Sequence, residues 1–85
     1  MDRENRLTEI PPGGAGRISR LDVTGAMRRH LMDLGFTPGA LARPLFSAPA
    51  GSPTAYAIRG AVIALRRGDG ELIWARPENG GGPWD

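Results

Sequence analysis

The chain has 85 residues, of which 40% are hydrophobic, so it has room for one small domain with a single core. It contains no cysteine, which excludes disulfides, zinc–thiolate sites, iron–sulfur clusters and cysteine nucleophiles. No apolar stretch approaches the roughly 20 residues that span a bilayer, and the charged start does not resemble a signal peptide, so we expect a cytoplasmic protein.

The basic character of the chain comes from arginine alone. Its 11 basic residues give a sequence pI near 10.4, although the formal net charge is only +2. Acidic residues are interspersed among the arginines, whereas a surface that tracks phosphates carries a continuous basic stripe. We therefore expect no nucleic-acid partner, and a nucleic-acid-binding barrel is kept as an alternative function.

The N-terminal part predicts two short strands behind a flexible end. Residues 1–6 are charged and lack periodicity, so we expect a flexible terminus there. Residues 7–10 are predicted as a first strand, and residues 16–23 follow as a second strand after a turn rich in proline and glycine. Ile18 and Leu21 lie three residues apart. This odd offset requires a β-bulge if both side chains are to reach the core.

Residues 25–34 are predicted as the one helix of the chain. Met27, Leu31 and Leu34 recur at helical spacing and define the face that we expect to be buried. Thr24 is the expected N-cap residue.

The end of this helix and the next strand are also marked in the sequence. Gly35 stands at the C′ position and Phe36 at C″, which is typical of a Schellman motif. Residues 41–47 predict a third strand. Pro44 removes one backbone donor from it, so we expect this strand to be an edge strand or to be bulged.

Residues 54–65 predict a β-hairpin. Tyr56 and Ile58 alternate with smaller side chains, Gly60 interrupts the pattern, and Ile63 resumes it. A glycine takes a positive φ without steric cost, so Gly60 fits a tight turn between two antiparallel strands.

The C-terminal part predicts one more strand and a tail. Residues 67–70 are expected to form a polar turn, and residues 72–76 the last strand, with Ile73 and Ala75 in the core. Residues 77–85 are rich in glycine, and we expect them to be a flexible tail.

Three blocks, in order along residues 7–76, share the signature of one known family. The first and weakest block consists of Leu7, Pro12, Gly13 and Ile18. The second consists of Arg29, Leu31, Leu34, Gly35, Pro38 and Gly39. The third consists of Gly51, Pro53, Tyr56, Ile58, Arg59, Gly60, Ile63, Ala64, Leu65 and Arg66. The chain resembles the FeoA family, small cytosolic proteins of bacterial ferrous-iron uptake. It departs from the family pattern at Ser52, where an acidic residue is usual, and at His30, where arginine is frequent.

The resemblance implies both a fold and a role. The implied fold is mainly β, a small SH3-like barrel of five to six strands with one inserted helix, which we assign to residues 7–76. The implied role is that of a non-enzymatic accessory protein that modulates the FeoB membrane iron transporter through protein–protein contact. The protein would then work in the cytoplasm, peripheral to the inner membrane through its partner. The sequence leaves weak self-association open. A stand-alone relative of the C-terminal domain of metal-dependent repressors is an alternative.

The sequence offers little for catalysis, and we predict no enzyme, no catalytic residue and no cofactor. Thr24 and Asp33 form no recognisable triad around His30, which is the single imidazole. The glycines match no phosphate-binding loop, and no lysine is present.

His30 and Asp33 share a helix face at a spacing of i and i+3, so both could touch one divalent ion. Two ligands are too few, because zinc sites use at least three protein ligands. We therefore predict no metal site.

Two surfaces are candidates for partner binding. Arg28 and Arg29 project from the helix off its apolar face and can pair with carboxylates. Leu72 and Trp74 on the last strand either form an exposed apolar patch or are covered by the N-terminal segment or the tail. Trp84 in the tail could dock on a neighbour, and the sequence gives it no role.

Overall fold

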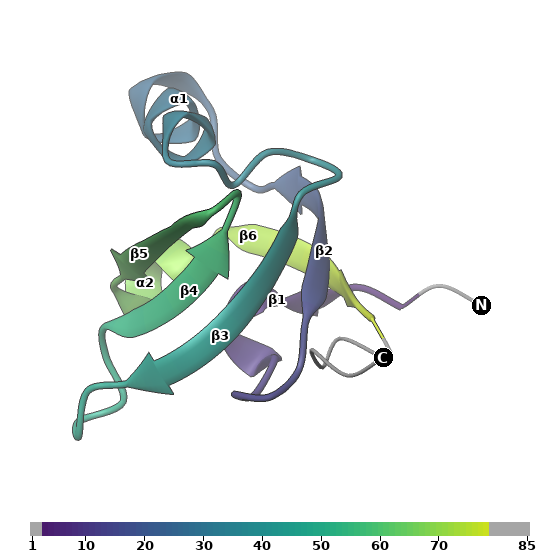
Figure 1. Ribbon diagram of the computed structural model, residues 1–85. Helices are drawn as coiled ribbons and strands as arrows, with labels where there is room; N and C mark the ends of the chain where they lie inside the picture. Colours follow the sequence, from purple (N-terminus) through teal and green to yellow (C-terminus); the bar gives the residue numbers. More distant parts are fainter. Residues whose placement is uncertain (1–2, 79–85) are drawn as a thin grey trace.

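The computed structural model describes residues 3–78, and it consists of one antiparallel sheet with three short helical segments (Figure 1). In chain order the elements are β1 (Asn5–Arg6), the 3₁₀ helix η1 (Leu7–Glu9), β2 (Gly16–Leu21), α1 (Gly25–Asp33), β3 (Leu41–Ser47), β4 (Thr54–Ile58), β5 (Ala61–Leu65), α2 (Arg67–Gly70) and β6 (Ile73–Pro77). The six strands are ordered β1-β6-β2-β3-β4-β5. The prediction of a mainly-β fold of five to six strands with an inserted helix is confirmed.

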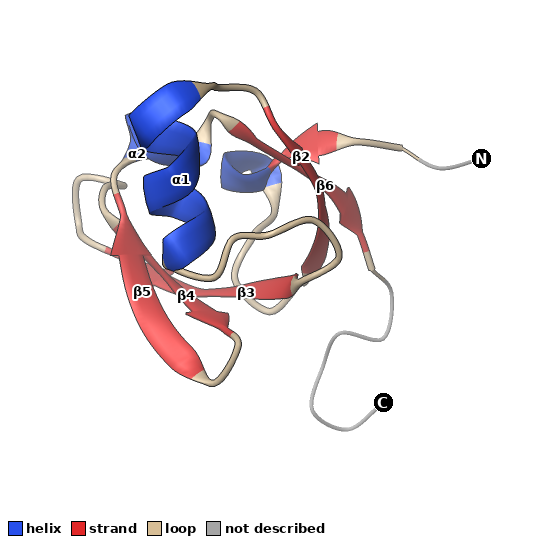
Figure 2. Cartoon of the chain, turned by 90° about the horizontal axis from the view of Figure 1, so that it is seen from above, coloured by secondary structure: helices blue, strands red, loops and turns tan. Residues whose placement is uncertain are grey.

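The sheet bends around a single core, with α1 standing at one end (Figure 2). Phe36 and Tyr56 are both buried in this core and meet edge to face, with ring centroids 6.0 Å apart. The strands β1 and β5 do not pair with each other, so the sheet curls without closing. The remaining buried core residues are Leu7, Ile10, Ile18, Leu21, Leu31, Ala40, Ala42, Ile58, Leu65, Ile73 and Ala75.

The prediction of a strand at residues 7–10 is wrong, because Leu7–Glu9 form the 3₁₀ helix η1. Leu7 and Ile10 are both buried. Side chains three residues apart eclipse on a 3₁₀ turn, so the same two apolar residues reach the core without a strand. The Glu9 carboxylate accepts a hydrogen bond of 2.7 Å from the Arg6 backbone N–H, which caps this turn.

The folded part is longer than the predicted range of residues 7–76 at both ends. Asn5 and Arg6 pair with Ala75 and Trp74 in the sheet, so residues 5 and 6 are not a flexible terminus. At the other end, β6 extends to residue 77, beyond the predicted start of the tail. Trp84 lies outside the described residues.

Both predicted irregularities in the strands are present. The register of β2 against β6 shifts between Ile18 and Arg20, and this bulge brings Ile18 and Leu21 to the core. The register of β3 against β4 shifts between Pro44 and Phe46. β3 pairs with β2 only at Leu41 and Ala42, so Pro44 lies next to the bulge in a part of β3 that is paired with β4 alone.

The helix α1 ends as predicted. The N–H of Phe36 donates to the Leu31 carbonyl and the N–H of Gly35 donates to the Met32 carbonyl, which are the two bonds of a Schellman motif. Gly35 has a φ of +114°, in the region that favours glycine.

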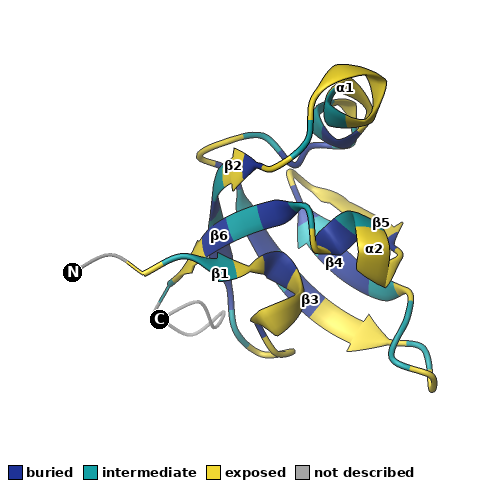
Figure 3. Ribbon diagram, turned by 180° about the vertical axis from the view of Figure 1, so that it is seen from behind, coloured by how far each residue is buried: buried dark blue, intermediate teal, exposed yellow. Residues whose placement is uncertain are grey.

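The start of α1 differs from the prediction in two respects. Thr24 occupies the N-cap position, but its side chain forms no capping hydrogen bond. Met27, predicted on the buried face, is 37% exposed, whereas Leu31 is fully buried. The reason is the position of α1 at one end of the sheet, so that only its C-terminal half reaches the core (Figure 3).

The hairpin of β4 and β5 is confirmed and has a two-residue turn, since Ile58 pairs with Ala61. Arg59 and Gly60 have φ values of +48° and +80°, so both central residues are left-handed, as in a type I′ turn. Residues 67–70, predicted as a polar turn, form the one-turn helix α2. No helix in the part of the chain that the structure describes is long and apolar enough to cross a membrane.

Candidate partner interface

The outer face of α1 forms an open hollow of about 490 Å³. Its residues recur at helical spacing along one face, so α1 alone supplies its wall, and they are Gly25, Arg28, Arg29, Met32 and Asp33. Gly25 has a φ of +71° and no atom within 4 Å of where a Cβ would stand, which leaves one end of the hollow open. The hollow therefore combines two guanidinium groups with one thioether on a helix face that no other described element covers.

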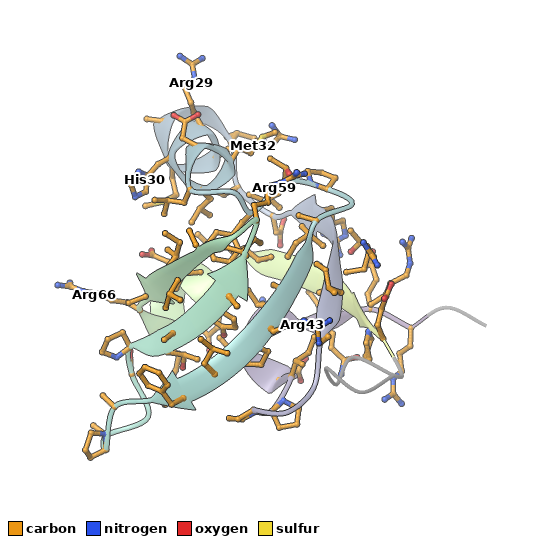
Figure 4. The ribbon with its side chains drawn as sticks, in the orientation of Figure 1. Arg29, His30, Met32, Arg43, Arg59 and Arg66 are labelled. Atoms are coloured by element: carbon orange, nitrogen blue, oxygen red, sulfur yellow. The ribbon has the colours of Figure 1, made fainter. Side chains whose placement is uncertain are left out.

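The two arginines of this face differ in how they are held. The Nη1 group of Arg28 donates to the Met32 sulfur at 2.9 Å, and Arg28 is half-buried. A thioether is a weak acceptor, so most donors of the Arg28 guanidinium stay available. Arg29 is exposed and projects away from the body of the protein (Figure 4). Within residues 3–78 neither arginine forms an ion pair.

His30 and Asp33 are both exposed on α1. The described residues contain no group of three or more side chains that could hold a metal ion.

Trp74 is covered on both sides by arginines from the neighbouring strands. Arg6 of β1 and Arg20 of β2 are its partners in the sheet, and each guanidinium carbon lies 4.7 Å from the ring centroid. This distance is that of a cation–π contact. Of the two arrangements that the sequence left open, the structure shows a covered Trp74, but the cover comes from Arg6 of the N-terminal segment together with Arg20 of β2.

Leu72 precedes β6, is half-buried and packs against the core. Its carbonyl accepts a hydrogen bond of 2.6 Å from the Asp22 N–H, in the segment that leads into α1, but Leu72 is not among the residues that line the hollow of α1. A role of Leu72 and Trp74 in partner binding stays a prediction. Since one packs inward and the other lies under two arginines, the α1 face is the more accessible candidate.

A bidentate ion pair joins β2 to the residue that follows β6. Arg17 donates to the two carboxylate oxygens of Glu78, from Nε at 2.7 Å and from Nη2 at 3.0 Å. These hydrogen bonds lower the pKa of the Glu78 carboxyl and raise that of Arg17. Glu78, which the sequence placed in the tail, thus has a structural partner.

The sequence analysis missed an apolar outer face on β3, β4 and β5. Phe46 and Val62 are 64% and 63% exposed. Cross-strand pairing of Phe46 with Ala55 and of Val62 with Ala57 places these side chains on the face opposite the core residue Tyr56. The hairpin sequence contained a sign of this apolar face. The outward positions of a half-exposed sheet are usually polar, but here they are occupied by alanine and valine.

Comparison with known proteins identifies the family of this fold. The FeoA domain model matches residues 5–77. Iron(II) transport protein A from Clostridium thermocellum is 33% identical, with a TM-score of 0.81 over 85% of this chain and 44% of that chain. FeoA from Chlorobium tepidum is 30% identical, with a TM-score of 0.82 over 93% of this chain and 75% of that chain. This chain thus spans less than half the length of the C. thermocellum protein. No curated protein matches the chain.

A more distant structure supports the fold. The zinc complex of FeoA from Stenotrophomonas maltophilia, described as a prokaryotic SH3 domain protein, is 22% identical, with a TM-score of 0.73 over 93% of this chain and 96% of that chain. At this identity the likeness concerns the fold alone, and it agrees with the SH3-like architecture implied by the resemblance. Because the family model covers residues 5–77 and a 30% identical FeoA protein shares the fold, the chain belongs to the FeoA family.

Proposed function

We propose that this protein is a non-enzymatic accessory protein of bacterial ferrous-iron uptake, which modulates an FeoB-type transporter through protein–protein contact. Membership of the FeoA family supports the connection to iron transport. The repressor-domain alternative has no observation in its favour beyond the fold, and a fold alone does not determine a function.

The observation that carries this proposal is the uncovered outer face of α1. Arg28 and Arg29 present guanidinium groups without a described carboxylate partner, beside the Met32 thioether. Guanidinium groups bind carboxylates in a bidentate manner, and methionine adapts its shape to apolar partners. A partner segment that carries carboxylates beside an apolar side chain would bind both the guanidinium groups and the thioether.

The proposed place of action follows from the partner. FeoB-type transporters lie in the membrane, so the protein would act in the cytoplasm at the inner face of that membrane. It would be held there by its partner, because no described helix of its own can span a bilayer.

Ferrous-iron transport in proteoliposomes tests this proposal. The liposomes are loaded with ferrous iron and contain a purified FeoB-type transporter with its cytoplasmic side outward, and GTP-dependent release of iron to the outside is measured in the presence and absence of the protein. We expect the protein to change the GTP-dependent release rate in a saturable manner. An unchanged rate, together with no detectable complex, would overturn the proposal.

A further inference from the structure

The strand β5 forms one margin of the sheet and carries no charged residue (Figure 1). Its residues are Ala61, Val62, Ile63, Ala64 and Leu65. Edge strands in soluble proteins are usually protected by charges, prolines, bulges or shortness, since an unpaired edge is a template for another strand. None of these protections is present, and the pairing of β5 with β4 runs over five consecutive residue pairs without a shift.

The opposite edge of the sheet is protected. There β1 consists only of Asn5 and Arg6, and the chain turns away immediately into η1. The contrast shows that the open edge of β5 is specific to this side of the molecule.

The hairpin turn determines which backbone groups of β5 are free. In a type I′ turn the Ala61 N–H points to β4, so along the antiparallel ladder Ile63 and Leu65 also bond inward. The N–H and C=O groups of Val62 and Ala64 therefore point away from the sheet. Among residues 3–78 they have no hydrogen-bond partner in another loop or strand.

Arginines flank this edge at both ends. Arg59 precedes β5, and Arg66 and Arg67 follow it. Arg59 donates to the Thr37 hydroxyl at 2.8 Å, whereas Arg66 projects away from the body (Figure 4). In the described part of the chain none of the three forms an ion pair.

This charge pattern disfavours one register of a second copy of the chain on the edge. An antiparallel pairing of two β5 strands about Ile63 would place Arg59 opposite Arg67 of the other copy, and like charges directly opposite are destabilising. Registers centred on Val62 or Ala64 place no arginine opposite an arginine, so a second copy is one of the outcomes that the experiment below distinguishes. An extended segment with carboxylates at its ends would instead meet guanidinium groups at both ends of β5.

We propose that the edge of β5 binds an extended, acidic-ended segment of the transporter partner as an additional strand of the sheet. The inference rests on the proposed function for the identity of that partner. The backbone groups of Val62 and Ala64 supply the hydrogen bonds, and Arg66 pairs with a carboxylate of the segment. The exposed Val62 side chain on the outer face of β5 covers an apolar residue of the added strand.

Two substitutions at one position isolate the backbone donor. Val62→Pro removes an outward N–H and leaves the hydrogen bonds to β4 in place, since proline is tolerated where the N–H of an edge strand faces solvent. Val62→Thr keeps the donor and the β-branched shape. We expect Val62→Pro to weaken binding of the purified transporter by roughly tenfold. Val62→Thr loses only an apolar contact and keeps the donor, so it should weaken binding by less than Val62→Pro. Equal affinities of the two folded variants would contradict the proposal. If Val62→Pro does not fold, Arg66→Glu replaces it, and unchanged affinity of that variant is the contradicting result.

Hydrogen exchange on the unmodified protein provides a test that does not depend on any variant. In the free protein, we expect the amides of Val62 and Ala64 to exchange quickly and that of Ile63 slowly. Saturation with the purified transporter should slow Val62 and Ala64. If the amides of Val62 and Ala64 become protected from exchange without the transporter, and more so at higher protein concentration, a second copy of the chain occupies the edge. That result overturns the proposal. A complex in which both amides still exchange quickly overturns the edge inference alone, whereas absence of any complex overturns the proposed function.

Discussion

Gly35 terminates α1 through its backbone conformation and not through lack of space. Its φ is +114°, while a Cβ built there would meet its nearest neighbour, in the Ile58 side chain, at 3.6 Å, an ordinary contact. Gly35→Val should therefore destabilise the protein by about 1 to 3 kcal/mol, because a β-branched residue is strongly disfavoured at positive φ. Arg29→Ala on the exposed side of the same helix should change stability by less than about 0.5 kcal/mol. Urea unfolding measures both, and equal midpoints would show that Gly35 is not the terminating residue.

Glu78 gives the fold a defined dependence on pH. Hydrogen bonds from Arg17 lower its pKa below the ordinary value of 4.5. A carboxyl whose pKa is lowered by folding contributes stability above that ordinary value, and the contribution is lost as the pH falls through the lowered value. Glu78→Gln should thus be less stable than the unmodified protein at pH 7, by a modest amount because the pair is partly exposed.

The difference between the two proteins should shrink as the pH falls below about 4. Unfolding by urea at a series of pH values measures it. A difference that stays constant over this range would contradict the assigned role of the ion pair.

At the scale of elements, Trp74 holds β1 and β2 against β6. Its ring lies between the guanidinium groups of Arg6 and Arg20, and a cation–π contact contributes about 0.5 to 1 kcal/mol at exposed sites. Trp74→Ala should therefore destabilise the fold by about 1 to 2 kcal/mol from these contacts and increase exchange at the amides of β1. Trp74→Phe keeps a ring and should lose less. Equal losses in the two variants would show that the aromatic face does not contribute.

The elements that could be predicted from the sequence are those with a strong local signal. Gly35 and Phe36 mark the end of α1, and the alternation around Gly60 marks the hairpin, because backbone conformation and side-chain period agree there. The 3₁₀ helix η1 could not be predicted, since Leu7 and Ile10 are compatible with either a bulged strand or a 3₁₀ turn. The exposure of Met27 depends on where α1 lies relative to the sheet. The helical periodicity of the sequence carries no information about that position.

The candidate sites, too, could be predicted only where the signal is local in the sequence. Arg28 and Arg29 were predicted correctly to lie on the helix side away from the core, because helical spacing alone determines that. The covering of Trp74 by Arg6 and Arg20 joins strands that are far apart in the sequence, so local patterns could only name it as one of two alternatives. The open edge of β5 depends on the order of all strands in the sheet.

At the scale of the whole molecule, the protein presents two surfaces on a small rigid fold. One is the arginine-bearing face of α1, and the other is the edge of β5 with its apolar outer face. Both lie on the described part of the chain. The first carries two arginines and the second is flanked by Arg59 and Arg66, so both are suited to the same kind of acidic partner.

Association kinetics with a purified FeoB-type transporter test the central claim most directly. The first comparison is between the unmodified protein and the double variant Arg28→Glu/Arg29→Glu. The second is between two single variants, Arg29→Glu and the control Arg3→Glu, which change the net charge by the same amount. Charges at an interface mainly change the association rate and its salt dependence. The double variant should associate more slowly, most clearly at low ionic strength, and Arg29→Glu more slowly than Arg3→Glu, with all variants folded. Unchanged association kinetics of the double variant would show that the α1 face is not the contact with the transporter.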